Sequence, residues 1–289
     1  AKSIREMVRF HTENYYIPAE KSHQAKLLLS FLKDNIPDKN SPYGILLNQE
    51  INLLQDNDYL FSHYLSDVNQ PYYFHEFMSE ASQHQLQYLC DTAIETMFVG
   101  NFSENIRNQF NSISNDLIKT EQYLDFLTNR RFRSSLLCHA NVTLNRNLTP
   151  QRLQSFYFRG LLQSAVPFSQ IDIHANQSYE FKSLNGIHFS SANALELALI
   201  KILIENKHPL SEEQITKKMS TLFSEQAPNI LKETVLTIVL RLFLGGAIAL
   251  YMDDKTYCQN ASETPLVSNL TRLQAKNGYK ITSQLGDNV

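Results

Sequence analysis

The feature that most constrains the fold is the stretch Pro71–Arg146, in which two apolar, aromatic segments flank a polar one. The first segment, PYYFHEFMSEASQHQLQYL (71–89), opens on an aromatic cluster that encloses His75 and Glu76. Its apolar residues from Phe77 to Leu89 fall at about helical spacing. This spacing predicts an amphipathic helix after Pro71.

The second segment, EQYLDFLTNRRFRSSLLCHANVTLNR (121–146), begins with a second helical stripe. A basic turn and the short apolar run 136–138 follow, and the length of that run is typical of a strand. The stripe consists of Tyr123, Leu124, Phe126 and Leu127.

These segments resemble the methyltransferase regulatory domain of some bacterial S-adenosylmethionine-dependent methyltransferases. The words YFHEF, LQYL and QYLDFLTNRRFRSSLLCHA carry the resemblance, and REMVRFHTENY (5–15) and PLVSNLTRLQAKNGYKITS (265–283) extend it over most of the chain. In that family a class I, Rossmann-like methyltransferase domain comes first, and relatives include bacterial protein-lysine methyltransferases. The resemblance implies that S-adenosylmethionine binds in that domain of the parent protein. It also implies two partners for this chain, the class I domain and a protein substrate.

The expected fold is α+β and mainly α-helical, in three parts. Residues 1–150 form the helical regulatory domain, and residues 151–260 form a winged-helix-like domain with a small antiparallel sheet. Residues 261–289 form a C-terminal extension, cut from a longer chain. The second part begins where residues 155–191 alternate with period two around turn signals at Asn176 and Asn185-Gly186.

Three helices are predicted after that hairpin. Ser191 is expected to cap the first, which runs to Asn206, and Ser211 and Gln214 have the spacing of a capping box for the second. The third covers 229–244 and leads into a wing formed by AIALYM (247–252) and YCQN (257–260). The chain is expected to end in strands paired around Asn277-Gly278.

The stretch Val235–Met252 is apolar enough to suggest a membrane span. Arg241 lies near its centre, where a charge is costly in a bilayer, and Gly245-Gly246 interrupts it. A buried helix followed by a strand is therefore expected, with no membrane span.

Composition restricts the compartment and the partners. The chain is 43% hydrophobic and has a net charge of −3, which disfavours a polyanionic partner. From Ser191 to Asn260, seven Lys or Arg face eight Asp or Glu, so the winged-helix-like part is not expected to bind nucleic acid. Three widely spaced cysteines and no CxxC pair favour a reducing, cytoplasmic setting.

A cofactor site is not expected in this segment. A methyltransferase needs a glycine-rich turn after its first strand, so that the backbone approaches the cofactor closely. The eight glycines form neither GxGxxG nor GxG. The sequence therefore predicts that S-adenosylmethionine does not bind here in the usual way, and it offers no catalytic residue.

Two groups of residues are candidates for docking or substrate contact. The first is the aromatic cluster with its polar members, Tyr72, Tyr73, His75 and Glu76. His75-Glu76 begins like HExxH, but residue 79 is Ser, so no metal site is expected unless His75, Glu80 and His84 converge.

The second group is the basic turn, with Arg130, Arg131 and Arg133. These cations could simply offset the helix dipole, or they could bind carboxylates within the chain or on the catalytic domain. Arg131 and Arg133 share a face if the segment is extended, with Phe132 anchored in the core.

Three functions remain open. The first is a non-catalytic regulatory or substrate-positioning region of a methyltransferase that acts on protein. The alternatives are a winged-helix regulator or protein-interaction module without a methyltransferase link, and a hydrolase built around His75 and Glu76.

Overall fold

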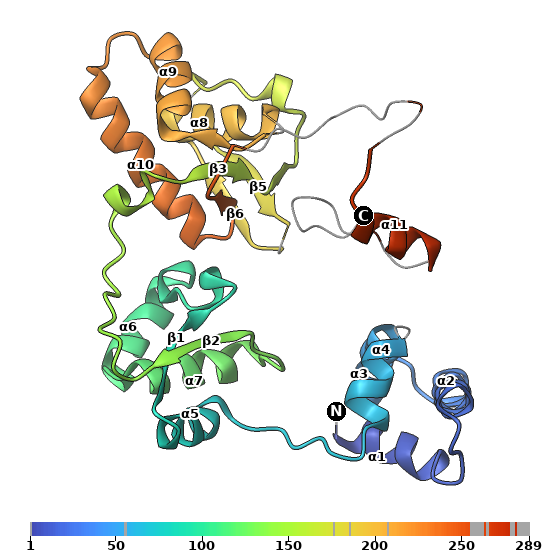
Figure 1. Ribbon diagram of the computed structural model, residues 1–289. Helices are drawn as coiled ribbons and strands as arrows, with labels where there is room; N and C mark the ends of the chain where they lie inside the picture. Colours follow the sequence, from blue (N-terminus) through green and yellow to red (C-terminus); the bar gives the residue numbers. More distant parts are fainter. Residues whose placement is uncertain are drawn as a thin grey trace. The chain divides into compact units, whose positions relative to one another are not determined.

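The computed structural model describes residues 2–54, 57–175, 177–184, 186–206, 208–254, 263, 266–277 and 281. These residues form a mainly α-helical α+β protein with small antiparallel sheets, which confirms the expected fold class (Figure 1). The chain divides into two compact units, Ala1–Tyr73 and Phe74–Val289. The separation of 1–150 from 151–260 stays a prediction.

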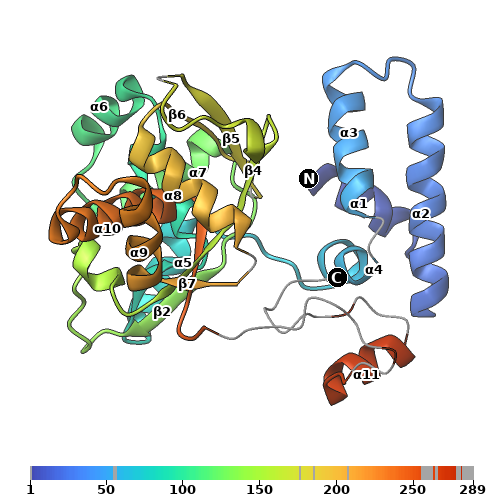
Figure 2. The same cartoon turned by 90° about the horizontal axis from the view of Figure 1, so that it is seen from above.

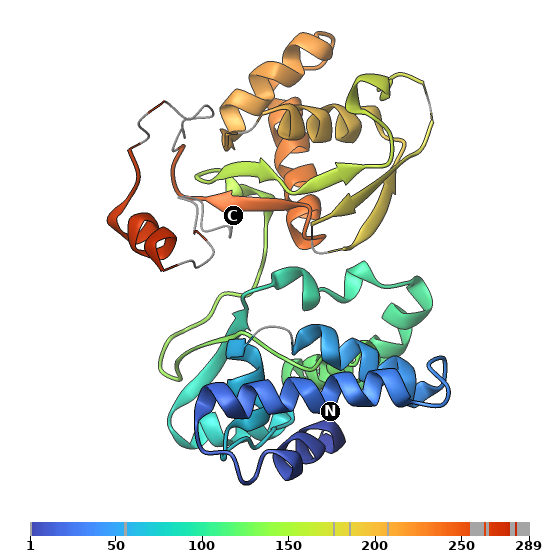
Figure 3. The ribbon, with the colours of Figure 1, turned by 90° about the vertical axis from the view of Figure 1, so that its right-hand side faces the viewer.

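Unit 1 is helical, as expected for the first part of the chain, and Figures 2 and 3 show its helices from two further sides. Pro18 and Pro42 start two of the helices, and the Ser41 Oγ caps the second of these by accepting from the Gly44 N–H at 3.1 Å. The helices are α1 (Lys2–His11), α2 (Pro18–Asn35), α3 (Pro42–Leu53) and α4 (Asn57–Leu60), followed by a π-helical turn (Phe61–Leu65).

Unit 2 begins with a small α/β arrangement that differs in one place from the sequence prediction. The helix after Pro71 ends at Gln83, and Leu86 and Leu89 belong to a strand instead. Gln85 adopts a left-handed φ of 58°, which stops the helix. The elements are α5 (Phe74–Gln83), β1 (Leu86–Asp91), α6 (Glu104–Ile113), α7 (Leu117–Thr128) and β2 (Ser135–His139).

β1 and β2 pair antiparallel, and β2 contains the strand predicted at 136–138. The register shifts between Tyr88 and Cys90, so Leu89 lies at a bulge. The Arg146 guanidinium donates to the carbonyl oxygens at this bulge, at 2.6 Å to Leu89 and also to Tyr88. A small core forms beside the pair, from Phe74, Met78, Ala81 and Tyr88.

The rest of unit 2 surrounds the largest apolar core that the structure describes. Two three-stranded antiparallel sheets, in the orders β7-β3-β8 and β4-β5-β6, accompany three helices (Figure 1). The elements are β3 (Tyr157–Gly160), β4 (Leu162–Ser164), β5 (Tyr179–Ser183), β6 (His188–Ser191), α8 (Ala194–Glu205), β7 (Leu210–Ser211), α9 (Glu212–Leu222), α10 (Pro228–Leu244) and β8 (Ile248–Tyr251).

The helix caps agree with the sequence at α9 and differ at α8. Ser211 and Gln214 form the predicted capping box. At α8 the cap is Asn193, whose Oδ1 accepts from the Glu196 N–H at 3.1 Å. Ser191 ends β6 two residues before this cap, and it instead donates from its Oγ to the Glu196 Oε2 at 2.5 Å.

The apolar stretch Val235–Met252 is a helix, a Gly245-Gly246 turn and a strand. Within the described ranges, no helix has both the length and the apolar character needed to cross a membrane. The predicted C-terminal strands are wrong over α11 (Asn269–Lys276), a helix capped by Ser268. Asn176, Asn185, Gly278 and the YCQN segment lie outside the described residues.

Candidate functional site

The basic turn follows a well-defined helix end. Asn129 adopts a left-handed conformation with φ 50°, and the Arg130 N–H donates to the Asp125 carbonyl at 2.9 Å. The Asn129 N–H donates to the Phe126 carbonyl at 3.4 Å, which completes a Schellman motif. The helix therefore ends in a tight reversal, and Arg130 and Arg133 after it reach back to carboxylates on α7 and β1.

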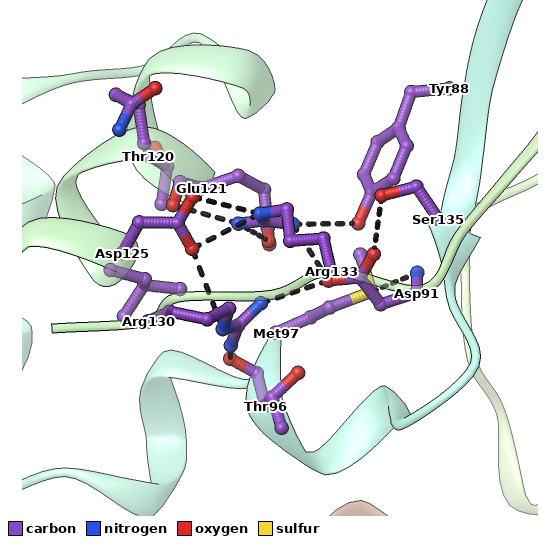
Figure 4. A network of polar contacts seen from close by, with 12 residues as sticks. Tyr88, Asp91, Thr96, Met97, Thr120, Glu121, Asp125, Arg130, Arg133 and Ser135 are labelled. Atoms are coloured by element: carbon purple, nitrogen blue, oxygen red, sulfur yellow. Dashed lines mark hydrogen bonds and ion pairs between the residues drawn. The ribbon is translucent and has the colours of Figure 1, made fainter. Parts of the chain in front are cut away.

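Arg133 is the centre of a polar network (Figure 4). Its guanidinium donates at 2.8 Å to Asp125 Oδ2, at 2.9 Å to Glu121 Oε2 and at 2.7 Å to Asp91 Oδ2. A further bond of 2.9 Å reaches the Glu121 carbonyl oxygen. The guanidinium carbon lies 4.0 Å from the centroid of the Phe74 ring, so stacking adds to the ion pairs.

Arg130 joins the same network from the start of the turn. It donates at 2.8 Å to Asp91 Oδ2 and at 2.8 Å to the Thr96 carbonyl oxygen, and its Nε lies 3.4 Å from Asp125 Oδ1. The Ser135 Oγ donates to Asp91 Oδ1 at 2.7 Å. Asp91, at the end of β1, therefore connects both arginines to β2 (Figure 4).

The network holds three carboxylates and two guanidinium groups, and its members are largely buried. Burial raises the pKa of Glu121, although Arg133 opposes this. Burial, with the nearby carboxylates of Glu121 and Asp91, also raises the pKa of Tyr88. Burial alone would lower the pKa of Arg133, but its bonds to Asp125 and Glu121 raise it overall. The arrangement keeps Arg133 charged and the Tyr88 phenol protonated. Because the ion pairs of Arg130 and Arg133 join residues 130–133 to α7 and β1, the network holds the turn in place.

The three arginines are distributed differently from the sequence prediction. Arg130 and Arg133 share the network, whereas Arg131 lies on the exposed side of the turn. Phe132 is 57% exposed and does not anchor the core. The reason is that the chain reverses at Asn129 and Arg130, and residues 130–134 are not part of a strand, so the alternation of an extended segment does not apply.

His75 is engaged with α7. Its backbone N–H and its Nδ1 lie 3.1 and 3.0 Å from the Oε1 of the buried Gln122. His84 and Glu80 form a separate exposed pair at 3.7 Å. The three groups do not converge, and the described residues contain no cluster of His, Cys, Asp or Glu able to hold a metal ion.

The other members of the aromatic cluster split between surface and core. Phe74 is buried at the start of α5, and its ring meets that of Tyr88 edge to face at 4.9 Å. Tyr72 and Tyr73 precede the helix and are exposed, as is Glu76 on α5. The structure therefore places Tyr72, Tyr73, His75 and Glu76 at the surface, with His75 also in contact with Gln122 of α7.

Sequence reasoning missed the acidic half of the network. Glu121 and Asp125 are one helical turn apart, so both can face one guanidinium. That spacing, followed by arginines within eight residues, was a signal in the sequence. Asp91 gave no such signal, because only the pairing of β1 with β2 brings it to the turn.

The comparisons with known proteins converge on this region. Residues 56–139 match the family described as "Predicted methyltransferase regulatory domain". Both arginines and all three carboxylates lie inside the matched segment. Residues 56–139 thus match the model of a methyltransferase regulatory domain, which confirms the resemblance seen in the sequence.

Similarity extends over nearly the whole chain in two longer proteins of Rickettsia. PKMT2 from Rickettsia typhi is 31% identical with a TM-score of 0.77, covering 99% of this chain and 58% of that one. Its complex with AdoHcy gives a TM-score of 0.75 at the same identity, with 99% and 57% covered. The uncharacterized protein RP789 of Rickettsia prowazekii is 33% identical over 95% of this chain and 50% of its own length. The chain thus spans about half the length of these relatives.

Proposed function

We propose that this chain is the non-catalytic, substrate-positioning region of a bacterial S-adenosylmethionine-dependent methyltransferase that acts on protein lysine. The observation that carries the proposal is the likeness to PKMT2 over 99% of the chain, together with the regulatory-domain match. PKMT2 has been solved with AdoHcy, which supports S-adenosylmethionine as the cofactor of the parent protein. The cofactor would bind in a class I domain of that protein, which is the first partner of this chain.

The region works as three parts with the boundaries expected from the sequence, 1–150, 151–260 and 261–289. A winged-helix-like assignment of the second part is supported by the order α8, α9, α10 and β8, with β3 between β7 and β8. Its balanced charge favours contact with protein over nucleic acid. The parent protein would work in the cytoplasm.

The arginine network holds the surface that meets the substrate or the catalytic domain. Arg130 and Arg133 fix the turn from within, while Arg131 lies on its exposed side. Tyr72, Tyr73 and Glu76 offer aromatic and acidic groups suited to a lysine-bearing segment. In this proposal His75 orients the start of α5 through Gln122.

Calorimetry tests the assignment of roles. Titration of the purified chain with S-adenosylmethionine should give no stoichiometric binding, and the chain alone should transfer no labelled methyl group to protein. A stoichiometric site of micromolar affinity in this chain would contradict a non-catalytic role. So would methyl transfer by the chain alone.

A further inference from the structure

The helix α7 exposes three large apolar residues and buries two polar ones, Glu121 and Gln122. Tyr123, Phe126 and Leu127, named here the α7 stripe, are 40%, 55% and 48% exposed. They lie at i, i+3 and i+4, which places them on one face of the helix. The Tyr123 and Phe126 rings lie 6.3 Å apart, edge to face, so the stripe is a packed aromatic surface.

The opposite face of α7 is held by polar contacts. Glu121 is 1% exposed and, with Asp125, binds Arg133, and Gln122 binds His75. Turning the helix to bury the stripe would break these bonds and leave charged groups unpaired, which costs more than the apolar burial would return. The network therefore fixes the stripe as the outward face.

A contiguous exposed apolar surface of this kind marks an interaction site. The length of the relatives indicates what covers it. This chain spans 58% of PKMT2. The other 42% of that protein can therefore supply the surface that packs against the matched region. Aromatic and leucine side chains suit a permanent interface between domains of one protein.

Pairing with a second copy is disfavoured by charge. Lys119 is exposed on the outer side of α7, and Arg131 is exposed just past its end. Two copies joined antiparallel through this face would bring these cations together. A partner that packs apolar side chains on the stripe and carries acidic groups around them would avoid this repulsion.

We infer that the α7 stripe is the surface on which the methyltransferase domain of the longer protein packs. The inference rests on the proposed function and adds to it the location of the domain contact. It separates two roles within one helix: the inner face holds the regulatory domain together, and the outer face joins it to the catalytic domain.

Hydroxyl-radical footprinting tests the inference directly, in this chain and in PKMT2. The oxidation rates of Tyr123 and Phe126 are measured relative to the unfolded chain, as are those of the PKMT2 residues that superpose on them. The stripe should react readily in this chain and roughly tenfold more slowly in PKMT2, because an interface core excludes water. Slow oxidation of Tyr123 and Phe126 already in this chain would show that another segment of the chain or a second copy covers the stripe. Full reactivity in both proteins would leave it without a partner, and either outcome overturns the inference.

A second measurement uses substitution in PKMT2. The positions that superpose on Phe126 and Leu127 are changed to Lys. The matched control is the same change at the position that superposes on Leu222, a residue of α9 that is 48% exposed, like Leu127. The stripe variants should lose methylation of protein substrate while still binding S-adenosylmethionine, and the control should retain both. Unchanged methylation in the stripe variants refutes the inference but leaves the proposed function standing, since that function is tested by cofactor binding to this chain.

Discussion

Glu121 depends on Arg133 more than the other two carboxylates of the network do. Asp91 and Asp125 also contact Arg130, whereas Arg133 is the cation that the structure pairs with Glu121. Removing Arg133 therefore leaves a buried carboxylate without its counter-ion. The cost of such a loss is much greater than the net contribution of the ion pair itself.

Replacing Arg133 by Met should reduce the free energy of unfolding by roughly 3–5 kcal/mol at pH 7, because Glu121 is left buried without its counter-ion. The matched control is Arg131→Met in the same turn. As an exposed cation it should cost no more than about 1 kcal/mol. Urea unfolding of both variants checks the prediction, and equal losses would show that the network does not hold the turn.

Glu121→Gln should change how stability depends on pH. Burial raises the folded-state pKa of Glu121 above the value of about 4.3 for an unfolded chain. The folded protein then binds more protons between the two values, so this group's contribution to stability is complete below about pH 4.3 and is lost as pH rises through the folded pKa.

The glutamine variant lacks this titration. The stability of the parent minus that of the variant should fall as the pH is raised from about 4.3 toward neutrality. Thermal unfolding of both proteins across this range measures the difference. A difference that stays constant or increases would mean that Glu121 is not the group carrying the raised pKa.

Among the elements, the sequence predicted the existence of α7 but not which of its faces is buried. Apolar spacing marks a helix from residue 123 onward, and α7 is there. Of the four residues that give this spacing, only Leu124 is buried, whereas Tyr123, Phe126 and Leu127 are exposed. Periodicity reports that a face is apolar and does not report what covers it, and here long-range ion pairs decided the orientation.

The strand β1 could be recognised only in part. Its residues continue the helical spacing of α5, yet the left-handed Gln85 and the pairing with β2 make them a strand. Pairing depends on residues about fifty positions away, which local spacing does not contain. Caps that depend on neighbouring residues, such as Ser211 with Gln214, were predicted correctly because all their information is local.

Two glycines with left-handed backbones permit a matched pair of substitutions. Gly246 lies between α10 and β8, and Gly186 lies between β5 and β6. Gly246 has φ +67°, and a Cβ there would meet the Glu95 Cγ at 3.0 Å, whereas Gly186 has φ +85° with nothing within 4 Å. Gly186→Ala should cost about 1–2 kcal/mol from the left-handed backbone alone. Gly246→Ala should cost more, because Glu95 must also move. Chemical denaturation measures both, and equal costs would show that the contact with Glu95 is slack.

At the scale of the whole molecule, the segment before α5 is the expected point of cleavage. Residues 67–73 are exposed and form neither helix nor strand. Chymotrypsin should therefore cut first after Tyr72 or Tyr73, between the two compact units.

Phe132 is the internal control for this cleavage. Its side chain is as exposed as that of Tyr73, at 57%, but ion pairs of Arg130 and Arg133 hold the backbone on both sides of it. Cleavage requires local opening, so Phe132 should resist. Mass spectrometry of the early fragments identifies the cut, and a first cut after Phe132 would contradict the rigidity assigned to the turn.

The composition and the overall pattern were enough to predict a mainly helical α+β chain, since its long periodic segments became helices. The hairpin at Gly186 and the change from α10 to β8 were also readable, because glycine turns mark them. The C-terminal strands were not, since an Asn-Gly pair suggested a hairpin where Ser268 caps a helix.

The contact of Arg146 with β1 has a consequence for aggregation. A two-stranded sheet leaves backbone groups along its outer margins available to a strand from another molecule. By occupying the carbonyl oxygens of Tyr88 and Leu89, the Arg146 guanidinium blocks part of that margin and leaves a bulky cation beside it. One side chain thus leaves fewer backbone acceptors on β1 available for strand addition by another molecule.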